Sequence, residues 1–173
     1  MSEVNATSWA YFDPSSTASY IKALDYLDTY VAAEGPFDGV LGFSQGASLA
    51  AMHLVRKAIQ APTEAPPFKC AILISCAAVY DPVAYFERGE VRVLDFERDG
   101  RPIKIPTVHI WGEQDPLHDQ SQDLSKLCEP SQATVFVHEG KHEVPRLSAR
   151  SALAGSVKAM RRGITLAALL EQA

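Results

Sequence analysis

The sequence predicts an α/β fold with a mostly parallel sheet and flanking helices. Short apolar segments of strand character alternate with segments in which apolar residues recur every three or four positions. The run 70–75 is almost continuously apolar, which is typical of a strand buried on both faces of a parallel sheet. A chain of 173 residues is long enough for one such core, so we expect residues 1–173 to form a single domain.

The first part of the chain predicts a helix, a strand and a second helix. Residues 15–17 offer an N-cap, apolar residues follow at steps of four, three and four, and Gly35-Pro36 ends this helix. The segment 38–43 predicts a short buried strand, and the next helix begins at Gln45. In that helix, small apolar residues share one face, and we expect His53 on a polar face.

The second part of the chain continues the alternation after the strand at 70–75. Apolar runs predict strands at 105–111 and 133–137. A short helix is expected at 120–128, and a helix interrupted near Gly163 is expected over 145–171. Strands joined by helices in this way favour parallel pairing, because a parallel connection needs a crossover.

Residues 80–105 are less regular than the rest. Apolar residues precede Asp99-Gly100 and Ile103 follows it, which predicts a small hairpin because Asp-Gly readily adopts the positive φ angles of a tight turn. We interpret 80–105 as an insertion near the mouth of a site at the ends of the strands.

Composition and charge exclude several classes of partner. The formal net charge is −5 and no basic run exceeds Arg161-Arg162, which argues against a nucleic-acid partner. The sequence contains neither a signal-peptide pattern nor about 18 consecutive apolar residues, so we expect no membrane partner and a cytoplasmic location.

The cysteines and histidines show no pattern of metal binding. Cys70, Cys76 and Cys128 are odd in number and scattered, which argues against a disulfide framework and matches a reducing compartment. No Cys/His cluster has metal-ligand spacing, and no glycine-rich phosphate loop follows a strand, so we expect neither metal nor cofactor.

The segment Gly42-Phe43-Ser44-Gln45-Gly46 lies between a predicted strand and a predicted helix. Gly-x-Ser-x-Gly is common by chance, but this context makes it the nucleophile elbow of an α/β-hydrolase. The turn is sharp, so we expect both glycines to avoid side-chain clashes. Ser44 is the predicted nucleophile, and the Gln45 amide at the helix N-terminus is the predicted oxyanion donor.

Two later residues complete a predicted catalytic triad. Asp115 follows the strand at 105–111 and His142 follows the strand at 133–137, in the order that this fold uses. His142 would act as general base and Asp115 would orient its imidazole and stabilise the imidazolium.

Other residues compete for these roles. His138 ends its strand too early, His109 falls inside a strand, and Cys76 follows a strand without an elbow around it. The alternatives are Glu113, Asp119 and Asp123 for the carboxylate, and His138, His109, His118 and His53 for the base.

With these residues in view, the sequence resembles the fungal-type FSH family of serine hydrolases. The resemblance rests on the elbow block 35–47, on Trp111 to Asp115, and on Gly140 to Pro145. It implies hydrolysis of carboxylic esters or acyl thioesters, including release of polyketide chains in secondary metabolism, with an acyl carrier protein as a partner. Acyl-protein thioesterases share Gly-Phe-Ser-Gln-Gly and are the nearest rival family.

The chain departs from the family at its start. Family members begin with an apolar strand and a Leu-His-Gly-type loop that supplies the second oxyanion donor, and neither precedes the first helix here. We therefore expect either an N-terminally truncated hydrolase fold or an assembly, such as a homo-oligomer, in which a partner covers the exposed strand edge near Val40. Lys141 also stands where a small residue is expected.

Three functional hypotheses follow. The first is a hydrolase that forms an acyl-Ser44 intermediate. The second is a non-catalytic or repurposed binding protein on the same fold. The third is a cyclase or lyase that uses His142 as a base.

Overall fold

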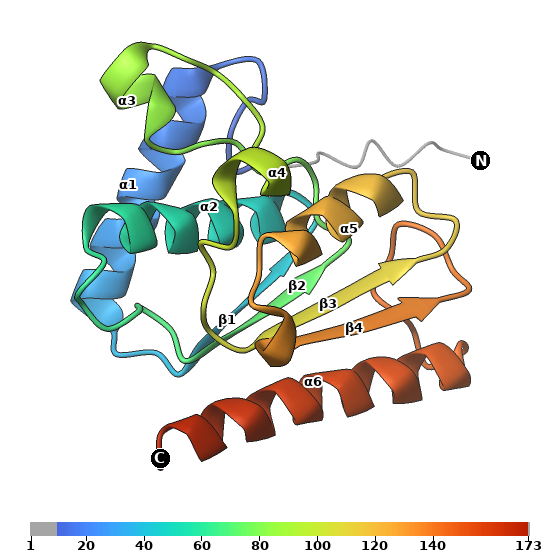
Figure 1. Ribbon diagram of the computed structural model, residues 1–173. Coiled ribbons are helices and arrows are strands. Elements are labelled where there is room, and N and C mark those ends of the chain that lie inside the picture. Colours follow the sequence, from blue (N-terminus) through green and yellow to red (C-terminus); the bar gives the residue numbers. More distant parts are fainter. Residues whose placement is uncertain (1–9, 173) are drawn as a thin grey trace.

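The structure, a computed structural model, describes residues 10–172 and is built on four parallel strands (Figure 1). The strands lie in the order β1-β2-β3-β4, and each neighbouring pair is parallel, as predicted. Their carboxyl ends therefore meet at one end of the sheet. The strands are β1 (Gly39–Phe43), β2 (Cys70–Ile74), β3 (Thr107–Gly112) and β4 (Ala133–His138).

Helices cover both faces of the sheet. In Figure 1, α2 and α5 pack on one face with α1 outside α2, and α6 lies across the other face. The larger part of the core lies under α2, and a smaller cluster around Ile72, Ile110 and Ala159 lies under α6. The helices are α1 (Thr17–Glu34), α2 (Gln45–Gln60), α3 (Ala84–Arg88), α4 (Phe96–Asp99), α5 (His118–Lys126), the 3-10 helix η1 (Pro130–Gln132) and α6 (Arg150–Leu170).

The first helix begins and ends where its sequence signals predict. The Ser16 side chain accepts a hydrogen bond from the Ser19 amide, and Gly35 follows the last helical residue. Tyr20 and Leu24 are buried toward α2. The capping and periodicity signals were therefore sufficient for this helix.

Strand β1 is more exposed than its apolar sequence predicts. Leu41 and Phe43 are 60% and 37% exposed, although they pair with Ile72 and Ile74, which lie buried under α6. Helix α6 covers β2, β3 and β4 and leaves this face of β1 open. Among the described strands, β1 has one neighbour, β2. The expected absence of a preceding strand and loop involves residues 1–9, which lie outside the described residues.

The prediction of a polar face at His53 is wrong. Residues 47–56 of α2 are all buried, because α1 packs over the side of α2 that the sheet leaves free. The His53 Nδ1 lies 3.2 Å from Asp28 Oδ1, and Arg56 also contacts Asp28. Burial lowers the pKa of His53 to about 4, so its imidazole is neutral at pH 7.

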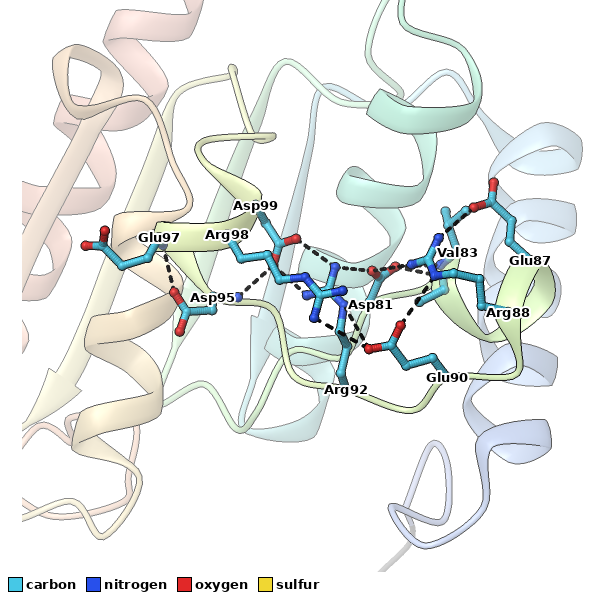
Figure 2. A network of polar contacts seen from close by, with 11 residues as sticks. Asp81, Val83, Glu87, Arg88, Glu90, Arg92, Asp95, Glu97, Arg98 and Asp99 are labelled. Atoms are coloured by element: carbon cyan, nitrogen blue, oxygen red, sulfur yellow. Dashed lines mark hydrogen bonds and ion pairs between the residues drawn. The ribbon is translucent and has the colours of Figure 1, made fainter.

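The predicted hairpin at Asp99-Gly100 is also wrong. Asp99 ends the short helix α4, and Gly100, at φ 65°, serves as its C-cap. Figure 2 shows the reason: the Asp99 carboxylate accepts hydrogen bonds from the Arg92 guanidinium, which also contacts buried Asp81. Ile103 pairs with Cys128 instead of with the strand before the turn.

Helix α6 is continuous, so the predicted interruption at Gly163 is wrong. It begins at Arg150 and runs past Gly163 to Leu170. A Cβ at Gly163 would lie 2.3 Å from Cγ2 of Val108. The glycine therefore allows close approach of helix and sheet.

The described residues bear on two expectations from composition, the absence of a membrane-spanning segment and the absence of a disulfide framework. In this part of the chain, no helix combines the length and apolar character needed to cross a membrane. Cys70, Cys76 and Cys128 are buried free thiols, as expected from their scattered positions.

Candidate active site

The turn between β1 and α2 holds Ser44 in a strained backbone conformation. Its φ is 54° and ψ is −121°, a region that residues with side chains rarely adopt. The Ser44 amide donates to the Ile74 carbonyl at 2.9 Å, which anchors the turn to β2. A Cβ at Gly42 would lie 2.6 Å from backbone atoms of Gly46 and Ala47. Gly42 is therefore required by the turn itself.

Gly46 has a different constraint from the one that the motif predicts. The nearest atom to a Cβ at this position belongs to the Tyr11 ring, at 3.3 Å. The limit on residue 46 comes from a side chain that reaches the elbow from the segment before α1, and not from the backbone of the turn.

The structure brings the three residues of the predicted triad together. Nε2 of His142 lies 2.9 Å from Oγ of Ser44, and Nδ1 lies 3.0 and 3.1 Å from the two carboxylate oxygens of Asp115. A carboxylate can only accept, so Nδ1 carries the proton and Nε2 is left to accept from the serine hydroxyl. This arrangement lets His142 remove the Ser44 proton.

Asp115 is held in its ionised form. Burial by itself raises the pKa of this carboxyl, but the Leu117 amide, Ser75 and His142 together bring the pKa below its usual value. The Leu117 amide donates to Oδ1 at 2.8 Å. An ionised Asp115 can stabilise a positive charge on His142.

The loops that carry Asp115 and His142 are bound to each other through their backbones. The Glu113 amide donates to the His138 carbonyl at 2.7 Å, and the Gln114 amide donates to the Gly140 carbonyl at 3.1 Å. A Cβ at Gly112 would lie 2.2 Å from the Gly140 oxygen. Gly112 therefore allows the histidine loop to cross the end of β3.

Lys141 does not disturb this loop. Its side chain is exposed, and its carbonyl accepts from the Glu143 amide at 2.9 Å. The Lys141 side chain, which is larger than the residue expected at this position, thus extends into solvent beside His142.

Two residues near the triad were not assigned a site role from the sequence. The Phe43 ring lies 5.0 Å from the His142 imidazole and covers one side of it. Ser75, fully buried at the end of β2, has φ 47° and lowers the pKa of Asp115. The only sequence signals for these two roles are that Phe43 directly precedes the nucleophile and that Ser75 directly follows the neighbouring strand.

The competing histidines lie in other contacts. His109 is buried in β3 with Nε2 3.0 Å from the Thr107 hydroxyl, and burial lowers its pKa to about 4. Nδ1 of buried His138 accepts from the Gly140 amide. His118 lies beside exposed Asp119, and His53 is buried under α1.

Cys76 lacks the properties of a nucleophile. It is buried, and its Sγ lies 3.6 Å from the Ser48 hydroxyl. Burial raises the pKa of the thiol to about 12, so the reactive thiolate is scarce at pH 7.

Gln45 occupies the position predicted for an oxyanion donor. It is the first residue of α2, and the N–H groups of a first helical turn have no acceptor within the helix. Its backbone N–H can therefore donate to a negative charge that forms near Ser44.

Comparison with known proteins places the chain among serine hydrolases. A family model described as serine hydrolase (FSH1) matches residues 2–152. Esterase FPY3 from Fusarium mangiferae is 44% identical over 141 residues, covering 81% of this chain and 63% of the relative. Family of serine hydrolases 2 from Saccharomyces cerevisiae is 32% identical over 144 residues, covering 79% and 60%. The chain thus spans about three fifths of the length of these relatives.

Solved structures share the fold. A fungal esterase from Rhizomucor miehei has a TM-score of 0.53 and 14% identity, covering 89% of this chain and 61% of its own. A carboxylesterase from Mesorhizobium loti has a TM-score of 0.52 and 17% identity, covering 87% and 69%. These similarities show that the sheet and helices form an α/β-hydrolase fold, as predicted.

Proposed function

The chain belongs to the serine hydrolase (FSH1) family, and on this basis we propose that it cleaves carboxylic esters through an acyl-Ser44 intermediate. The observation that carries the proposal is the unbroken series of contacts from the Ser44 hydroxyl through His142 to Asp115. The similarity to a fungal protein named an esterase, at 44% identity, supports the same reaction class.

The proposed reaction uses each of these groups in turn. Oγ of Ser44 attacks the ester carbonyl while Nε2 of His142 accepts its proton, and the imidazolium then donates this proton to the leaving alcohol. A water molecule, deprotonated by His142, hydrolyses the acyl-enzyme and restores Ser44. Proton transfer by a positioned base contributes about 10² to 10⁴ in rate.

The developing oxyanion would be stabilised at the start of α2. The Gln45 amide and the helix dipole both favour negative charge there. In serine hydrolases, the loss of one oxyanion donor costs about 10² to 10³ in rate. Activity of the chain should therefore depend strongly on the placement of this amide.

We extend the proposal to acyl thioesters, including acyl chains held by an acyl carrier protein. Ser44 would attack a thioester carbonyl by the same route, and a thiolate leaves with less help from the His142 proton. Rates on a p-nitrophenyl ester and an N-acetylcysteamine thioester of the same acyl group would test this extension. A thioester rate equal to that of a Ser44→Ala variant would contradict it.

Labelling with a fluorophosphonate tests the main proposal. We expect one adduct, located by peptide mass spectrometry at Ser44, and none in Ser44→Ala. Ser131→Ala, a change at an exposed serine in η1, should label like the wild type. A folded wild-type protein without a Ser44 adduct would rule out the acyl-serine mechanism, and turnover that survives Ser44→Ala would favour a cyclase or lyase with His142 as base.

The exposed face of β1 favours a second candidate, a binding protein on the hydrolase fold. Leu41 and Phe43 offer an apolar surface at the strand that carries the elbow. This candidate predicts no turnover of short p-nitrophenyl esters by folded protein. Measurable turnover that Ser44→Ala abolishes would exclude it.

A further inference from the structure

The Gln45 side chain joins the elbow to a distant segment of backbone. Its Oε1 accepts hydrogen bonds from the amides of Tyr11 and Phe12, at 2.6 and 3.3 Å. Its Nε2 donates to the Phe12 carbonyl at 2.8 Å. One carboxamide thus binds both donors and an acceptor of a segment more than 30 residues away in sequence.

Both ends of the carboxamide are needed for these contacts. Glutamate would keep the acceptor for the two amides but would place an anionic oxygen against the Phe12 carbonyl. Asparagine is one methylene shorter and would not span the same distance. The position therefore requires glutamine for a reason separate from the backbone amide that Gln45 directs toward an oxyanion.

The segment bound by Gln45 is anchored on one side and exposed on the other. Phe12 is buried, and its ring lies edge-on to Tyr20 of α1 at 6.1 Å. Tyr11 is 67% exposed, yet its ring lies against Gly46, two residues after the nucleophile. The Tyr11 ring therefore lies at the start of α2.

We propose that the Gln45 side chain is a positioning residue that holds Tyr11 as one wall of the substrate entrance and fixes the Gln45 amide beside the nucleophile. This role rests on the proposed esterase function. Tyr11 contacts the part of the ester that extends away from Ser44. The three hydrogen bonds hold the Tyr11 ring in a fixed position relative to the elbow.

Hydrogen exchange and kinetics together test this role. In Gln45→Ala, we expect faster exchange of the Tyr11 and Phe12 amides and a loss of kcat/KM of about tenfold, or about 1.4 kcal/mol. Gln45→Glu should recover part of the protection and part of the rate. Gln60→Ala, at the exposed end of the same helix, should change neither.

Tyr11→Ala distinguishes a role of Tyr11 in substrate contact from a role in the stability of the fold. Because the ring is largely exposed, we expect little change in Tm. Relative to the wild type, KM should rise several-fold for long acyl esters and less for acetate esters. A purely structural role would not produce this dependence on acyl length.

The outcomes distinguish the two proposals. Normal labelling of wild-type Ser44, with unchanged exchange or unchanged kcat and KM in Gln45→Ala, would overturn the positioning role alone. An absence of wild-type labelling would overturn the proposed function and the positioning role with it, whatever the exchange experiment shows.

Discussion

At the scale of single residues, the site combines a strained backbone with a carboxylate held in its charged form. Ser44 and Ser75 are the two described residues other than glycine with positive φ, and they follow neighbouring strands. Such strain persists only where surrounding contacts hold it, and it concentrates at functional sites. The Ile74 and Ile110 carbonyls supply these contacts by accepting from the two serine amides.

Asp115→Asn should reduce kcat/KM by about 10³ to 10⁴ without unfolding the protein. The amide would donate to Nδ1 of His142, which would move the proton to Nε2 and remove the acceptor for Ser44. Initial rates on p-nitrophenyl esters measure the loss. Asp119→Asn, an exposed neighbour, serves as control, and a loss below tenfold in Asp115→Asn would argue against the assigned role.

Because His109 is buried, we expect the stability of the protein to depend on pH. Its pKa falls from the usual 6.5 to about 4 in the folded protein because burial disfavours the charged ring. Between these values, the unfolded chain binds a proton that the folded protein does not, so stability falls as the pH is lowered through this window.

His109→Gln should remove one of two such contributions to this pH dependence, because buried His53 has a similarly lowered pKa of about 4 and keeps its own. One proton contributes at most about 1.4 kcal/mol per pH unit to the slope of unfolding free energy against pH. Urea unfolding between pH 7 and 4.5 would measure the slope, and His118→Gln, at a partly exposed site, should leave it unchanged. The same slope in His109→Gln and wild type would show that His109 is protonated equally in both states.

At the scale of elements, small residues set how closely helices approach the sheet. A Cβ at Gly155 would overlap the Phe136 ring, and one at Gly163 would overlap Val108. Both glycines lie on α6 and face strands that it covers. Helix propensity therefore gives way to packing at these positions.

Gly163→Ala should destabilise the protein by about 1–3 kcal/mol, although alanine favours helix formation. The added methyl group would overlap Cγ2 of Val108. In a Val108→Ala background that methyl is gone, so the same change should cost less. Chemical denaturation of the four proteins in this double-mutant cycle gives the coupling, and additive effects would contradict the proposed contact.

At the scale of the whole molecule, β1 is the least protected part of the sheet. It carries the elbow, it has one described neighbour, and α6 does not extend over it. An unpaired strand edge with apolar side chains is a template for pairing with another chain. We propose that a second copy of the chain covers this edge.

Leu41→Lys should therefore reduce self-association, because a charge on the exposed face of β1 opposes its burial. Sedimentation velocity at tens of micromolar protein should show a dimer for the wild type and a monomer for the variant. Val135→Lys, on the opposite edge strand β4, is the matched control and should still dimerise. A wild type that stays monomeric over the whole concentration range would refute the prediction.

Features that depend on local pattern could be predicted from the amino-acid sequence alone. Apolar runs and helical periodicity predicted the order of strands and helices. The elbow around Ser44 and the loop positions of Asp115 and His142 followed from their places after strands. Parallel strands bring their carboxyl ends together, so residues far apart in sequence could be expected at one site.

Features that depend on contacts between distant segments became visible in the three-dimensional structure. The neutral state of His53, the role of Asp99 as a partner of Arg92, and the reach of Gln45 to Tyr11 all arise from such contacts. Burial and hydrogen bonding are properties of pairs of segments. The local sequence pattern of one segment does not specify which other segment it contacts. For the same reason, the exposure of β1 depends on where α6 lies and not on the apolar residues of the strand.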